Sequence, residues 1–132
     1  MSKKQNKPIE VPSIKDYLKD QQRDGSELCA ADVFAETMDW LKSYGCENVV
    51  SRQIVEEYAM SVARWTHIER LISKYGYIAK HPTTGEPMQS PYVVMAQTYM
   101  KQVIAIRAEI NLALKNYRPN VKMAVREVVY GG

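Results

Sequence analysis

Six basic residues near the N-terminus are the side chains of this chain best suited to binding phosphate: Lys3, Lys4, Lys7, Lys15, Lys19 and Arg23. Asp16, Asp20 and Asp24 alternate with the last three at helical spacing, a pattern that is also typical of a solvated helix face whose charges neutralise one another. The first acidic residue is Glu10, so the three lysines before it form the cluster that attracts phosphate most strongly. The net charge of +3 does not by itself indicate nucleic-acid binding, so we expect any such contact to lie on this arm and on the helix that follows it.

The other reactive side chains form no recognisable catalytic or metal site. A P-loop needs a glycine-rich turn followed by Lys and Ser or Thr, and none of the six glycines lies in that setting. Cys29 and Cys46 lie outside any familiar nucleophile motif, and together with His67 and His81 they lack the closely spaced pairs of structural zinc sites. We predict that the protein is not an enzyme, that it has no catalytic residues, metal or cofactor, and that both thiols are reduced.

Length and composition favour a single domain inside a cell. The 132 residues are 45% apolar and 25% charged, with a formal net charge of +3, as in ordinary globular proteins. No apolar run approaches the roughly 18 to 20 residues that a membrane span requires, and the N-terminus lacks the apolar region of a secretory signal. We predict a cytoplasmic protein with no membrane contact.

Proline and glycine positions divide the chain into three parts. Residues 1–12 are predicted to be a flexible basic arm, residues 13–118 a single helical domain, and residues 119–132 a C-terminal tail. The tail alternates small apolar and basic residues, and a short helix, an edge strand and a partner-binding peptide all remain open for it.

The apolar spacing predicts an all-α domain of about four helices, dominated by two long antiparallel ones. A short first helix follows the cap candidate Ser13, and a second runs from the cap candidate Ser26 to the stop at Tyr44-Gly45. The long helices are predicted from about Ser51 to Tyr75 and from Ser90 to Asn116. The connector between them, from Gly76 to Pro91, is predicted to be a short β-hairpin or an ordered loop, with the hairpin favoured.

Each of the last three predicted helices carries an apolar stripe. The stripe of the second helix is Leu28, Ala31, Ala35, Met38 and Leu41; that of the first long helix is Ile54, Tyr58, Val62, Trp65, Ile68 and Ile72; that of the second long helix is Ala96, Tyr99, Met100, Val103, Ile110 and Leu114. Met95, Ile106 and Ala113 widen the last stripe on one flank, which favours contact with another subunit. We predict core or oligomer packing for Tyr58, Trp65, Ile68, Tyr99, Val103, Ile106, Arg107 and Ile110.

Arg107 is the exception among these packing residues because it carries a charge in the middle of an apolar stripe. A buried guanidinium without a partner is strongly destabilising, so we expect the carboxylate of Glu56, Glu57 or Glu69 beside it. An ion pair across a subunit interface and a direct phosphate contact are the alternatives.

From Ala30 to about Asn120 the order of features resembles the small terminase subunits of tailed bacteriophages, of the type with a hairpin of long helices. The features are Ala31 to Trp40 in a helix, Tyr58-Ala59 and Ala63-Arg64-Trp65 in a long helix, then Tyr75-Gly76-Tyr77-Ile78, Thr84-Gly85-Glu86-Pro87 and Ser90-Pro91 before a second long helix. The chain departs from the family at Leu114-Lys115-Asn116-Tyr117-Arg118-Pro119, where many members have a Gly-Leu-Thr-Pro-like turn and a nearby arginine.

The resemblance implies a non-catalytic DNA-recognition subunit of the genome-packaging machine of a phage or prophage. It implies a homo-oligomeric ring in the cytoplasm of the bacterial host, with double-stranded viral DNA and the large terminase subunit as partners. By the same analogy, the C-terminal tail is expected to contact the large subunit. Two other classes remain: a structural helical adaptor that does not bind DNA, and a dimeric helix-turn-helix regulator that uses the first two helices.

Overall fold

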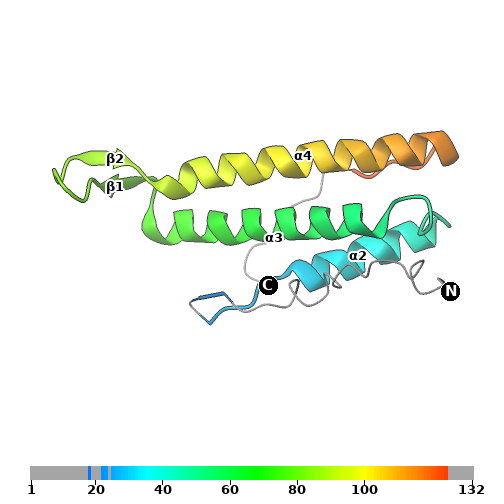
Figure 1. The fold of residues 1–132 in the computed structure, drawn as a ribbon, viewed down its shortest axis with the longest axis horizontal. Coiled ribbons are helices and arrows are strands. Elements are labelled where there is room, and N and C mark those ends of the chain that lie inside the picture. The colour runs from blue at the N-terminus through cyan, green and yellow to red at the C-terminus, as the bar shows by residue number, and fades with distance from the viewer. Residues whose placement is uncertain (1–17, 19–21, 24, 125–132) are drawn as a thin grey trace, which may run out of the picture.

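Two long helices run antiparallel along the length of the molecule and are joined at one end by a small β-hairpin (Figure 1). The computed structural model describes residues 18, 22–23 and 25–124. The elements in this part of the chain are α2 (Ala30–Ser43), α3 (Arg52–Tyr75), β1 (Ile78–Lys80), β2 (Pro87–Gln89) and α4 (Pro91–Tyr117). α2 packs against the first half of α3, on the side away from α4 (Figure 1). None of the helices in these ranges has the length and hydropathy needed to cross a membrane.

Local signals in the sequence fix both ends of the helical hairpin. α3 stops at Gly76, whose φ of 85° lies in a region that side chains disfavour and whose N–H donates to the Ile72 carbonyl at 2.7 Å. α4 starts after Ser90, whose hydroxyl accepts a hydrogen bond from the Tyr92 N–H, and Pro91 occupies the first turn. α4 ends at Tyr117, before the Arg118-Pro119 pair. The predicted bounds of the two long helices are confirmed to within about one residue of each end.

The connector between α3 and α4 is a β-hairpin, as favoured from its sequence. β1 and β2 are antiparallel, with Ala79 opposite Met88 at the centre of the ladder. The His81 imidazole stabilises the loop, because its Nδ1 accepts from the backbone N–H groups of Thr83 and Thr84 at 3.1 and 3.3 Å. His81 therefore has a hydrogen-bonded structural role in a polar connector.

The core consists of two clusters along the α3–α4 seam. The larger one lies where α2, α3 and the C-terminal half of α4 meet, and its fully buried side chains include Leu41, Val55, Tyr58, Ile110 and Leu114. The smaller one, near the β-hairpin, contains Ile68, Ile72 and Ala96. Trp65 packs against both clusters and so connects them.

The described residues contain three helices, where about four were predicted. Most of the predicted first helix falls outside the described residues, although Leu18 within it is helical and buried. The predicted start of the second helix at Ser26 is wrong, since α2 begins at Ala30. Ser26 belongs to a turn instead: its carbonyl accepts from the Gln22 N–H at 2.7 Å, and Gly25 beside it has a φ of 86°.

Two predicted stripe positions are also wrong. Ala35 is exposed, because the buried face of α2 runs through Ala30, Val33, Thr37 and Leu41. Thr37 can lie on that buried face because its hydroxyl is hydrogen-bonded: Oγ1 donates to the Val33 carbonyl at 2.7 Å.

Met100, expected on the buried stripe of α4, is 38% exposed. The buried positions of that helix are Ala96, Val103, Ile110 and Leu114, and their spacing of seven and four residues defines a narrow seam. Met100 lies at the edge of this seam.

Candidate functional site

The predicted DNA-binding residues fall almost entirely outside the part of the chain that the structure describes. Lys3, Lys4, Lys7, Lys15 and Lys19 are all in this group. Arg23 is described, and it is exposed in the turn before α2. The basic arm therefore stays a prediction from the sequence.

The predicted packing residues lie along the facing sides of α3 and α4. Tyr58, Ile68, Val103 and Ile110 are buried, whereas Trp65, Tyr99, Ile106 and Arg107 are half-buried. Tyr99 and Ile106 border a hollow of about 520 Å³ between the two helices. The half-buried members are the ones that a neighbouring molecule can still reach.

Arg107 makes no ion pair with any residue in the described ranges. Of the three expected partners, Glu56 lies instead 3.8 Å from Arg52, one turn away on its own helix. Arg107 lies beside the seam of α4 rather than in it, and it lines an open hollow of about 630 Å³ together with Asn111 and Lys122. Because water reaches a half-buried guanidinium, no buried counter-ion is required.

Residues 118–124, here called the C-terminal strap, fold back along α4 (Figure 1). The Asn111 side chain holds the strap through both the NH2 group and the carbonyl oxygen of its amide. Its Nδ2 donates to the Met123 carbonyl at 3.1 Å, and its Oδ1 accepts from the Met123 N–H at 2.6 Å. A side-chain amide thus takes the place of a neighbouring strand, so part of the predicted tail packs on the helical domain.

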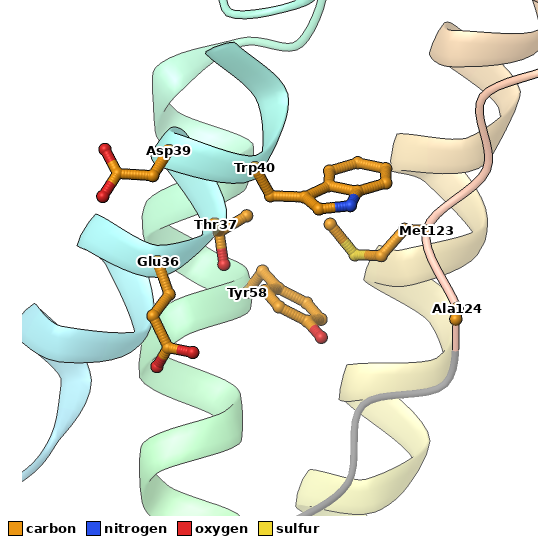
Figure 2. A pocket seen from close by; sticks show the side chains of 7 residues that line it. All are labelled: Glu36, Thr37, Asp39, Trp40, Tyr58, Met123 and Ala124. Carbon is orange, nitrogen blue, oxygen red and sulfur yellow. The ribbon is translucent and has the colours of Figure 1, made fainter. Parts of the chain in front are cut away.

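Met123 closes the gap between the helices. Figure 2 shows Trp40 of α2 and Tyr58 of α3 reaching toward the strap, where the Met123 side chain points back at them. Met123 is 9% exposed, and Val121, the other inward residue of the strap, is also buried. The surrounding pocket of about 410 Å³ is lined on the α2 side by Glu36 and Asp39.

A second contact ties the strap to the opposite helix. The Arg118 guanidinium donates from Nη1 to the Tyr44 carbonyl at 2.9 Å, at the point where α2 ends. The Tyr44 carbonyl has no hydrogen-bond partner within α2, and the Arg118 guanidinium supplies one. The strap therefore joins the ends of α2 and α4, which are far apart in the sequence.

Exposed apolar side chains also lie along α4 outside its seam with α3. They are Val94, Met95, Met100, Ile104 and Leu112, and Leu112 is 62% exposed. A helix that is apolar on most of its circumference is ordinarily covered on more than one side. The seam with α3 covers only one side of α4.

The model of the family described as phage terminase, small subunit, matches residues 30–119, which is more than half of the chain. The chain belongs to the phage terminase small subunit family. The match begins at the first residue of α2 and ends two residues after α4, so it contains all three described helices and the β-hairpin. No curated protein and no solved structure gives a significant match.

Family membership confirms the predicted resemblance and assigns this terminase small subunit a role in phage DNA packaging. Small terminase subunits are generally non-catalytic components of that machinery. The basic arm and residues 120–124 of the strap lie outside the matched region.

Sequence reasoning missed the pairing of Asn111 with Met123. A polar amide in the middle of an apolar helix was one available signal, and the alternation Val121-Lys122-Met123 was another, since a period of two is typical of an extended segment with one buried face. Nothing in either signal names the other residue, so their contact was not predictable from the sequence.

Proposed function

We propose that this terminase small subunit is the DNA-recognition component of a phage packaging machine. It assembles into a homo-oligomeric ring in the host cytoplasm, binds double-stranded viral DNA and presents it to the large terminase subunit. The observation that carries the proposal is the family match, which spans every described helix from residue 30 to residue 119.

Self-association is supported by the two exposed sides of α4. On one side Ile104 and Leu112 are open to solvent, and on the other Tyr99 and Ile106 line the hollow beside α3. Burial of apolar surface contributes about 25 cal/mol per Å² before the entropic cost of association is subtracted, so a second copy that covers these side chains gains a favourable contribution. When the same contact repeats from one copy to the next with a rotation that closes, the copies form a ring.

A ring also makes weak DNA contacts useful. Lys3, Lys4 and Lys7 of a single arm offer few charges, but several arms that act on one duplex raise the effective concentration of binding groups. The modest net charge of +3 per chain is compatible with this arrangement. Affinity for DNA is then steeply dependent on salt and weakly dependent on sequence.

Mass measurement by multi-angle light scattering, with and without duplex DNA, tests the proposal. A mass of many subunits that rises when DNA is added supports it. A monomer at high micromolar concentration contradicts the ring. An oligomer without DNA affinity at low salt identifies the chain as a structural adaptor, and a dimer that prefers palindromic DNA identifies a helix-turn-helix regulator.

The C-terminal tail, residues 119–132, is the proposed contact with the large subunit. A chain that ends at Ala124 keeps the strap and its bonds to Asn111, so it separates recruitment from folding. In a pull-down with the large subunit, this shortened chain is expected to lose binding while its helical content and oligomeric mass stay unchanged. Full retention of the large subunit places the contact outside residues 125–132.

A further inference from the structure

The charges of this chain are separated along the sequence. Residues 25–57 contain seven acidic and two basic residues, whereas residues 58–107 contain two acidic and six basic residues. The first range contains α2 and the start of α3, and the second contains the rest of α3, the β-hairpin and the first two thirds of α4. The small overall charge therefore conceals a basic part of the molecule on the side of the β-hairpin.

The basic side chains near the β-hairpin are exposed and free to bind a ligand. Arg70, Lys74 and Lys80 are all exposed, and within the described residues none of them forms an ion pair. The Lys74 ammonium lies 5.3 Å from the centre of the Tyr75 ring, a cation–π contact that orients the charge and leaves it accessible to solvent. Between residues 70 and 92, Glu86 is the only acidic residue.

Exposed aromatic and apolar side chains accompany these charges. Tyr75, Tyr77 and Ile78 are exposed at the same end of the molecule, and Tyr77 is 69% exposed. The two-stranded ribbon extends beyond the ends of α3 and α4 (Figure 1), so its tip is not flanked by either helix. Tyrosine hydroxyls and lysine ammonium groups are common donors to DNA phosphates, and the major groove is wide enough for a two-stranded β-ribbon.

We propose that the β-hairpin end, with Lys74, Lys80, Tyr75 and Tyr77, binds the phosphate backbone of duplex DNA. This inference rests on the proposed function and adds a contact surface that is separate from the N-terminal arm. In a cyclic assembly, equivalent points on all copies lie at the same height along the axis, so the β-hairpins gather on one rim. Lys74 and Lys80 of all copies then form a ring of positive charge that faces the regularly spaced phosphates of the duplex.

The test compares two double variants that remove the same charge. Lys74→Gln/Lys80→Gln changes the β-hairpin end. Lys42→Gln/Lys115→Gln changes two exposed lysines in the last turns of α2 and α4, at the opposite end of the helical hairpin (Figure 1). Fluorescence anisotropy with a labelled duplex gives the dissociation constant at two salt concentrations, and light scattering gives the mass of each assembly.

The expected effect follows from counterion release. Each phosphate contact contributes a slope of about −0.9 in log affinity against log salt, so a fourfold rise in salt lowers affinity about 3.5-fold per contact. Every copy in the assembly carries both substitutions, so the fall in affinity between about 50 and about 200 mM salt is reduced by about 12-fold for each subunit that contacts the duplex through both lysines. We expect this in Lys74→Gln/Lys80→Gln, with unchanged mass, and a much smaller change in Lys42→Gln/Lys115→Gln.

Three results overturn the inference. Affinity and salt slope equal to those of the unaltered protein show that the β-hairpin end does not contact DNA. A smaller mass with unchanged DNA affinity assigns this surface to a contact between subunits. An unaltered protein that binds no duplex at either salt concentration contradicts the proposed function itself, and with it this surface.

Discussion

Replacing Asn111 with alanine tests whether the C-terminal strap stabilises the helical domain. The substitution removes two hydrogen bonds, at 2.6 and 3.1 Å, which contribute about 1 kcal/mol each to the free energy of unfolding. Alanine is also the better helix former, by about 0.6 kcal/mol in a helix interior. The net expectation is a loss of about 1.4 kcal/mol.

Asn116→Ala is the matched control. Asn116 is an exposed residue of the same helix, so its replacement reports the gain in helix propensity without the strap. Asn116 lies in the last turn of α4, where helix propensity counts for less than in the interior, so the two variants are expected to differ by about 1.4 to 2 kcal/mol in free energy of unfolding. Urea denaturation followed by far-UV circular dichroism measures this difference, with the protomer concentration held constant because association adds to apparent stability.

A double-mutant cycle with Met123→Ala extends the test. Met123 is buried only while the strap is docked, so its truncation is expected to destabilise the Asn111→Ala protein less than the unaltered protein. A coupling energy above about 0.5 kcal/mol shows that Asn111 and Met123 act together to dock the C-terminal strap. Equal stabilities of Asn111→Ala and Asn116→Ala would refute the assignment, because the two hydrogen bonds would then make no net contribution.

Three further substitutions test the rest of the fold and the proposed assembly. Ile110→Ala empties a fully buried position of the α3–α4 seam and is expected to reduce the free energy of unfolding by about 2 to 5 kcal/mol in urea denaturation; a loss under about 1 kcal/mol contradicts the described core. Gly76→Ala forces a side chain to adopt a φ of 85° and is expected to destabilise by about 1 to 3 kcal/mol in the same assay, where an unchanged midpoint argues against this helix end. Ile104→Lys/Leu112→Lys places charges on the exposed side of α4 and is expected to lower the mass seen by light scattering while helical content stays constant; an unaltered mass excludes this side as a subunit contact.

The elements that the sequence predicted well are those whose signals are local. Gly76 ends α3 through its own backbone conformation, and Ser90 with Pro91 starts α4 through a hydroxyl and a ring that act within one turn. Ser26 offered an equally good local signal, but Gly25 and the Gln22 carbonyl bind the same segment into a turn. Two local preferences competed there, and the sequence does not show which one is the more stable.

The features that were not predicted, the environment of Arg107 and the docking of the strap, depend on which distant segment of the chain packs against α4. Periodicity gave the angular position of Arg107 around α4, but its solvation depends on the open hollow beside the strap. The strap in turn depends on a contact between Asn111 and Met123, twelve residues apart, through a chain reversal at Pro119. The charge separation was present in the sequence, but a net charge of +3 averages the acidic and basic parts and conceals it.

The geometry of α4 links the proposed assembly to the proposed DNA surface. α3 covers the narrow seam of Ala96, Val103, Ile110 and Leu114, and the strap covers part of a second side near Asn111. Tyr77 and Ile78 are exposed at the β-hairpin, whereas the exposed apolar residues that remain on α4, including Ile104 and Leu112, lie along the body of that helix. A neighbouring copy that packs on them leaves Lys74 and Lys80 uncovered, because these lysines lie on the last turn of α3 and on β1. One molecule can therefore contact its neighbours along the helices and a duplex at the hairpin without competition between the two surfaces.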